Sequence, residues 1–164
     1  MAIQQQSRHP RFVCDVMLAR IARYLRAAGY DTLLADPQAP DAELVRRAAE
    51  ENRWLLTMDR QILEHKAGRG RVRLLPQGTV QEQAQWLAAD LGLDWLLQPF
   101  SRCLVDNSPL APAPAELVVQ VPAFVSETAT EFMACPECGR VYWAGSHHRR
   151  MRATLAAWQT ASTS

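Results

Sequence analysis

The sequence predicts an α/β fold, in which a parallel sheet is flanked by helices, followed by a small ribbon-like unit. Short apolar runs alternate with segments of helical periodicity up to about residue 98, which is the pattern of strands joined by crossover helices. Past Phe100 prolines are frequent and cysteines occur in a paired arrangement. We therefore expect a first domain over 11–98 and a second, smaller one over 99–158.

Length and composition agree with a small folded protein. The chain has 164 residues, of which 48% are hydrophobic and 21% charged, a mixture that argues against disorder and against a coiled coil. No apolar run approaches the roughly 20 residues needed to cross a bilayer, and the N-terminal segment has no hydrophobic signal region. We expect a cytoplasmic protein whose four cysteines are thiols or metal ligands rather than disulfide partners.

Charge differs between the two parts of the chain. Residues 1–76 carry 13 Lys or Arg against 9 Asp or Glu, whereas the remainder carries 5 against 8. A modestly basic first half suits a polyanionic partner, although the surplus is far below that of a dedicated nucleic-acid binder.

The first domain is expected to contain alternating strands and helices. The apolar runs predict strands at 12–14, 32–35, 54–57 and 72–75. The helical spacing of apolar residues predicts helices at 16–28, from Asp41 onward, at 60–66 and at 80–91. Gly29 ends the first helix, and Asp41 is expected to act as the N-cap of the second, with Glu43 favoured by the positive helix end. In the second domain, 117–119 is β-prone and 147–158 is expected to form a terminal helix whose last residues fray.

Acidic residues follow three of the predicted strands, namely Asp15, Asp36 and Asp59. Ligands bind beyond the carboxyl ends of parallel strands, and Asp41 at the head of a helix is expected to point to the same edge. Clustered carboxylates repel unless a cation is present, so they favour a hard divalent metal such as Mg²⁺ or Mn²⁺ and phosphodiester hydrolysis. The alternative is structural: Asp15 and Asp41 as caps, Asp36 in a turn, and Asp59 at a helix start.

A second cluster of metal-ligand residues lies in the C-terminal part. Cys135 and Cys138 have the C-x-x-C spacing of a zinc knuckle, followed by a glycine that permits a tight turn. Cys103 and Asp106 repeat the gap with an aspartate at the second position. These four residues form an acceptable zinc site, with His147 or His148 as substitutes; the alternative is a ribbon that has lost its metal and is held by packing alone. Cys14, inside an apolar run, is interpreted as a core residue.

Three stretches resemble the PIN-like ribonucleases: the pattern from Asp15 to Thr32, Asp41-x-Glu43-Leu44, and Thr57-Met58-Asp59. The chain is most similar to the Mut-seven C-terminal RNase domain family, in which a PIN-like domain precedes a zinc ribbon, and the resemblance runs from about Arg11 to Met151. The residue corresponding to Met58 is commonly polar or basic in that family. The resemblance implies a divalent-metal-dependent ribonuclease with its acidic site at Asp15, Asp41 and Asp59, and with Asp36 and Glu43 as further acidic candidates.

The segment Val141–Met151 also resembles the family, whose ribbon commonly carries Tyr-Trp and Gly-Ser-His. Aromatic rings beside cationic groups suit stacking on unpaired bases and contact with phosphates, while Trp143 itself is interpreted as ribbon core. Arginines 20, 23 and 26 are interpreted as a solvated helix face, except that Arg20 lies just over one turn after Asp15. The candidate contacts to RNA, expected to be single-stranded, are Arg20, His147, His148, Arg149 and Arg150.

Two functions thus follow from the sequence. The first is a cytoplasmic RNA-cleaving hydrolase with a Mg²⁺ or Mn²⁺ site in the PIN-like domain and structural Zn²⁺ in the ribbon. The second is a non-catalytic RNA-binding or protein-interaction module built on the ribbon, in which the acidic groups are caps.

Overall fold

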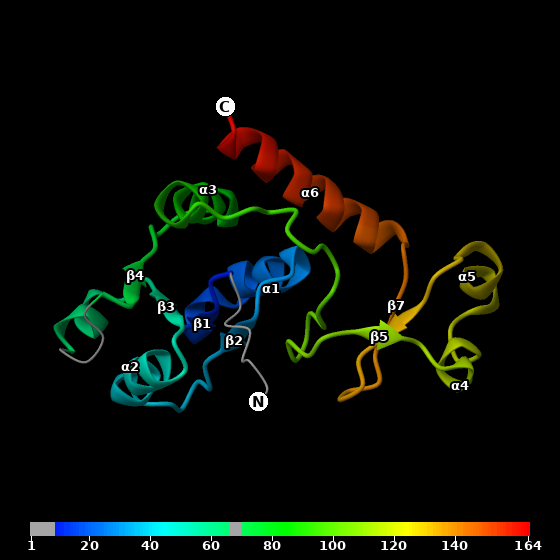
Figure 1. The fold of residues 1–164 in the computed structure, drawn as a ribbon, viewed down its shortest axis with the longest axis horizontal. Coiled ribbons are helices and arrows are strands. Elements are labelled where there is room, and N and C mark those ends of the chain that lie inside the picture. Colours follow the sequence, from blue (N-terminus) through cyan, green and yellow to red (C-terminus); the bar gives the residue numbers. More distant parts are fainter. Residues whose placement is uncertain (1–8, 66–69) are drawn as a thin grey trace, which may run out of the picture.

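The first half of the chain folds as a four-stranded parallel sheet with helices on both faces (Figure 1). The computed structural model describes residues 9–65 and 70–164. The strands are β1 (Phe12–Cys14), β2 (Thr32–Leu34), β3 (Trp54–Thr57) and β4 (Val72–Leu74), in the order β2-β1-β3-β4. The α/β prediction is therefore confirmed, and the two central strands are the ones that precede Asp15 and Asp59.

Two apolar layers enclose the sheet because successive side chains of each strand point to opposite faces. Phe12 and Cys14 of β1 enter the larger core, whereas Val13 enters the smaller one. The larger core is covered by α1 (Ala19–Ala28), α3 (Val80–Leu91) and α6 (Ser146–Ser162). The smaller one is covered by α2 (Asp41–Glu50) and the 3₁₀ segment η2 (Arg60–Glu64). In Figure 1, α3 and α6 accordingly lie on the opposite side of the sheet from α2.

Most element boundaries agree with the periodicity of the sequence. The predicted helix over 16–28 is split into a 3₁₀ turn, η1 (Val16–Leu18), and α1. It ends at Gly29, whose φ of 104° and closeness to the backbone of Gln98 exclude a side chain. α3 begins with a complete capping box between Thr79 and Glu82. The short helix expected over 60–66 ends at Glu64, and residues 66–69 lie outside the described part.

Two local predictions are wrong. Asp41 is the first residue of α2 rather than its N-cap, because the carbonyl of Pro40 already accepts from the N–H groups of Glu43 and Leu44. The β-prone run 117–119 does not form a strand. It lies in and directly after the short helix α4 (Ala115–Val118), whose first turn follows a proline.

The C-terminal half contains a small antiparallel sheet. Its strands are β5 (Ala111–Pro112), β6 (Met133–Ala134) and β7 (Val141–Tyr142), and α4 and α5 (Ala123–Thr128) connect β5 to β6. Figure 1 shows α4 and α5 beyond this sheet, away from the parallel one. α6 follows the ribbon in sequence but packs on α1 and α3. The division of the chain between residues 98 and 99 remains a prediction.

None of the helices in the described ranges is both long and apolar enough to cross a membrane.

A buried arginine joins the two halves. Arg26, expected on a solvated face, is only 7% exposed. Its Nε donates to the carbonyl of Thr32 at 2.8 Å, and its Nη1 donates to the carbonyls of Leu104 and Val105 at 3.1 and 3.0 Å. The prediction for Arg26 is wrong because helical periodicity does not show that a loop about 80 positions later covers this end of α1 and supplies two carbonyl acceptors.

A second polar contact reinforces this junction. Asn107 accepts from the N–H of Thr32 at 2.8 Å and donates to Asp31 at 2.7 Å, and Asp31 forms an ion pair with Arg53 at 2.8 Å. Burial raises the pKa of Asp31, but the bonds from Arg53 and Asn107 outweigh it and hold that pKa below its ordinary value. This stabilisation is therefore present above the unfolded pKa of about 4 and is lost as pH falls through the lower folded value.

Replacing Arg26 should destabilise the protein strongly. In Arg26→Met the stem is kept, but the carbonyls of Thr32, Leu104 and Val105 lose their donor. We expect the free energy of unfolding to fall by about 3 kcal/mol, since each buried bond to a charged group contributes about 1.5–3 kcal/mol. Urea unfolding, monitored by circular dichroism, measures this change in the free energy of unfolding.

Arg46→Met is the matched control, because Arg46 is exposed and its only ion pair in the described part is with Glu50 on the same helix. Its cost should stay below about 0.5 kcal/mol. Equal losses in the two variants would contradict a joining role for Arg26.

Candidate active site and metal centre

Two of the predicted acidic residues meet at the carboxyl edge of the sheet. The ladder between β1 and β3 extends to Asp15, whose N–H donates to the carbonyl of Leu56 at 3.0 Å. The hydroxyl of Thr57 donates to Oδ2 of Asp15 at 3.1 Å and accepts from the N–H of Asp59 at 3.0 Å. One hydroxyl therefore connects the two residues, because β1 and β3 are hydrogen-bonded neighbours in register.

Both carboxylates line one open hollow at this edge. The remaining lining residues come from the turns after β1, β3 and β4: Met17, Met58, Arg60, Gln77 and Gly78. Oδ1 of Asp59 also accepts from the N–H of Gln61 at 2.9 Å and so caps η2. Asp15 stands at the N-cap position of η1, but its side chain makes no capping bond.

Neither Asp15 nor Asp59 has an ion pair within the described part of the chain, although Arg60 lines the same hollow. Each also keeps one oxygen without a hydrogen bond to a described residue: Oδ1 of Asp15 and Oδ2 of Asp59. Free carboxylate oxygens that converge on an open hollow are the donors that Mg²⁺ and Mn²⁺ prefer. The residues present fit a hard divalent ion.

The other predicted acidic residues are placed differently. Asp36 accepts from the N–H of Gln38 at 2.8 Å, so it stabilises the turn after β2, as its structural interpretation expects. Asp41 and Glu43 lie in the first turn of α2, and within residues 9–65 and 70–164 their side chains make no hydrogen bond or ion pair. α2 follows β2, which is the edge strand next to β1. Asp41 and Glu43 therefore come from the connection after the edge strand and not from the two central strands.

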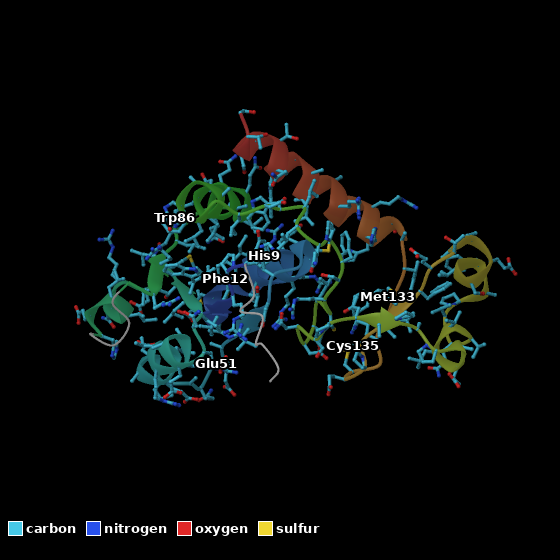
Figure 2. The ribbon with its side chains drawn as sticks, viewed as in Figure 1. His9, Phe12, Glu51, Trp86, Met133 and Cys135 are labelled. Atoms are coloured by element: carbon cyan, nitrogen blue, oxygen red, sulfur yellow. The ribbon has the colours of Figure 1, made fainter. Side chains whose placement is uncertain are left out.

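The predicted ribbon ligands are gathered into one cluster. Cys103, Asp106, Cys135 and Cys138 each offer one ligand atom, and these atoms lie within 4.8 Å of one another. The hairpin β6–β7 supplies two of them, and the loop before β5 supplies the other two. Figure 2 shows Cys135 close to Met133 at the ribbon, well separated from Phe12 in the parallel sheet. Three thiols and a carboxylate make a closed four-ligand set of the kind that binds zinc.

Hydrogen bonds order this cluster. Asp106 accepts from the N–H of Ser108 and from the Cys135 thiol, and these bonds hold its pKa well below the ordinary value. Burial raises the pKa of the Cys103 thiol, but bonds from the Tyr142 hydroxyl at 3.2 Å and from nearby N–H groups outweigh burial and lower it. Burial raises the pKa of Cys135 to about 11. The carboxylate and the Cys103 sulfur thus favour the anionic forms that metals require.

A groove lies between the ribbon, α1 and the start of α6. It has a volume of about 240 Å³, and Arg23, Tyr142, Trp143 and His147 are among its lining residues. Arg23 Nη2 lies 3.3 Å from Nε2 of His147. Trp143, expected in the ribbon core, is half-buried and lines this groove and the two hollows beside it.

The candidate RNA contacts are divided by this geometry. His147 and His148 line the groove, and Arg149 lines a neighbouring hollow beside α5. His148 stacks on Phe100 with ring centroids 3.8 Å apart. Its pKa is lowered mainly by burial and, to a smaller extent, by the charges of Arg152 and Arg149. A lowered pKa keeps the ring neutral at neutral pH, so His148 acts there as an aromatic surface rather than a cation.

Three contributors were not found by sequence reasoning. The sequence predicts Thr57 as the end of a strand and as part of the Thr57-Met58-Asp59 motif, but neither feature predicts the bond from its hydroxyl to Asp15. Tyr142 was read as an aromatic residue and not as a partner of Cys103. Arg23 was assigned to a solvated face. No local signal identifies the last two, because their partners lie 39 and 124 positions away.

Comparison with known proteins identifies the family. No curated protein and no solved structure matches the chain. The family model described as the Mut7-C RNAse domain matches residues 10–155, which include both acidic residues at the sheet edge and all four ribbon ligands. The description indicates ribonuclease activity and RNA as the substrate. The chain belongs to the Mut7-C RNAse domain family.

Proposed function

We propose that the protein is a divalent-metal-dependent ribonuclease whose reaction takes place at the Asp15–Asp59 edge of the parallel sheet. The observation that carries the proposal is that Thr57 links these two residues, donating to Oδ2 of Asp15 and accepting from the backbone N–H of Asp59, at an open hollow that both residues line. Carboxylates that line one hollow repel each other, and a cation bound between them would offset that repulsion.

The side chains have distinct roles in this proposal. The bond from Thr57 to Oδ2 of Asp15 leaves Oδ1 of this residue available, and the bond from the N–H of Gln61 leaves Oδ2 of Asp59 available. Asp41 is proposed as the third carboxylate, from the first turn of α2, and Asp36 and Glu43 are further acidic candidates. Mg²⁺ or Mn²⁺ bound there would supply activation of water and stabilisation of the leaving oxygen.

Zn²⁺ is proposed to be the metal of the ribbon cluster, held by Cys103, Asp106, Cys135 and Cys138. Its role would be structural, because the four ligands leave no open position for a substrate.

Single-stranded RNA in the cytoplasm is the proposed substrate, with Arg20 and the segment 147–150 as contacts. A non-catalytic module that binds RNA or protein is the second candidate. The observation that favours it is that Asp36 and Asp59 do act as turn and cap residues.

Removal of either edge carboxylate should abolish cleavage without unfolding the protein. We expect Asp15→Asn and Asp59→Asn to lower the rate of cleavage of a single-stranded RNA by at least about 100-fold in Mn²⁺, because several kcal/mol of transition-state stabilisation depend on the metal. Asp41→Asn tests the third carboxylate in the same assay. Thermal unfolding by circular dichroism checks that each variant folds.

Asp90→Asn is the matched control, since Asp90 pairs with Arg73 and lies outside the hollow. Its cleavage rate should equal that of the wild type. Full activity of Asp15→Asn or Asp59→Asn would refute the mechanism, and retention of RNA by a wild type that cleaves nothing would establish the second candidate.

The ribbon should hold about one equivalent of zinc per chain. Elemental analysis after gel filtration measures the content, and Cys138→Ser should reduce it because one thiolate is lost. Asp106→Cys should retain zinc at least as well. Cys14→Ala, which alters a thiol of the sheet core, is the control and should keep its zinc. A wild type that takes up no zinc even when zinc is supplied would show that the ribbon is held by packing alone.

A further inference from the structure

We propose that the groove between the ribbon and the start of α6 holds one nucleotide of the RNA strand, and that Arg20 and Arg23 guide the strand from this groove to the Asp15–Asp59 edge. The inference rests on the proposed ribonuclease function. It adds a path for the RNA strand and a minimum length of RNA for tight binding. It is supported by the lining of the groove, by its charge, and by the exposed face of α1.

The lining of the groove combines aromatic rings with a cation. Phe100, Tyr142 and Trp143 provide the rings, and the guanidinium of Arg23 lies within hydrogen-bond distance of His147, with Nη2 and Nε2 3.3 Å apart. Its volume of about 240 Å³ is below the roughly 300 Å³ at which sites for drug-sized molecules begin, so it suits the base of a single nucleotide. Aromatic rings stack on the face of any of the four bases.

The charge around the groove is positive and unbalanced. Neither Arg20 nor Arg23 has an acidic partner among the described residues. The first turn of α6 contains no acidic residue and no side-chain cap, although His147, Arg149 and Arg150 lie close to it. Cations at a helix N-terminus oppose the helix dipole. An anion such as a phosphate, bound between these cations and the N-terminus of α6, would offset their repulsion.

The exposed face of α1 connects the groove to the acidic edge. Met17 of η1 and Arg20 and Arg23 of α1 follow one another at intervals of three and are all exposed. Met17 lines the hollow of Asp15 and Asp59, and Arg23 lines the groove. The six positions between Met17 and Arg23 correspond to roughly 9–12 Å, since the rise per residue is about 2 Å in a 3₁₀ turn and about 1.5 Å in an α-helix. A strand of a few nucleotides therefore reaches from one site to the other, with Arg20 at the middle.

This path selects single strands. A base must leave its stack to lie on Tyr142 or Trp143, and bases of a duplex are stacked and paired. The acidic edge alone would repel a polyanion, whereas cations on the same helix offset that repulsion.

Binding of labelled oligouridylates to the Asp15→Asn protein tests the path without cleavage. Oligomers of about 12 nucleotides should bind at least ~10-fold more tightly than a single uridine nucleotide, because a single nucleotide cannot occupy both sites. Adding Arg20→Ala and Arg23→Ala should remove this advantage. It should also reduce the slope of log affinity against log salt by about 0.7 for each arginine lost.

Arg46→Ala with Arg47→Ala is the matched control, since both side chains are exposed on α2 and should leave affinity and slope unchanged. Trp143→Ala should lower the affinity for the longer oligomer about 10-fold, and Trp143→Phe should restore it. Zinc content and thermal unfolding of the Trp143 variants show whether the ribbon is intact.

Equal affinity and slope in the arginine variant and its control would overturn the path and leave the ribonuclease proposal standing. Equally tight binding of a duplex would overturn the selection of single strands. If the wild type binds with the predicted dependence on length and salt but never cleaves, the proposed function fails while the path is retained.

Discussion

The guanidinium of Arg26 sets the relation between the two halves of the molecule. A buried cation requires several acceptors with defined geometry, and Arg26 finds one on β2 and two in the loop between Cys103 and Asp106. The ribbon is therefore held against the end of α1, not joined by a flexible linker. The groove beside Arg23 exists because of this docking, since its walls come from α1, the same loop, β7 and α6.

The same loop serves two purposes. The carbonyls that accept from Arg26 belong to Leu104 and Val105, and the residues on either side of them are two members of the ribbon cluster. A metal that orders Cys103 and Asp106 also orders these carbonyls, so occupancy of the ribbon and docking of the ribbon stabilise each other. This coupling gives a structural metal an effect on the parallel sheet, which contains none of its ligands.

Sequence reasoning was most successful where a feature depends on local periodicity. The parallel sheet, the span of α3 and the end of α1 at Gly29 agree with it, and the C-x-x-C spacing with its upstream partner identified all four cluster residues. It failed where distant parts of the chain decide the outcome. The burial of Arg26 and the contact between Tyr142 and Cys103 depend on the docked ribbon. The helix at 115–118 forms where β-prone residues follow a proline that starts a turn.

The acidic edge and the basic face belong to one continuous segment, and this has an electrostatic consequence. Asp15 directly follows β1, and η1 and α1 come next, so the carboxylate and the exposed arginines belong to one continuous piece of secondary structure. Two carboxylates near a polyanion would weaken its binding. Arginines at a fixed distance on the same helix offset that loss without neutralising the carboxylates, because no ion pair forms between them in the described residues. In the proposed function, the edge would thus keep its charge for a metal ion while the helix would attract the phosphates.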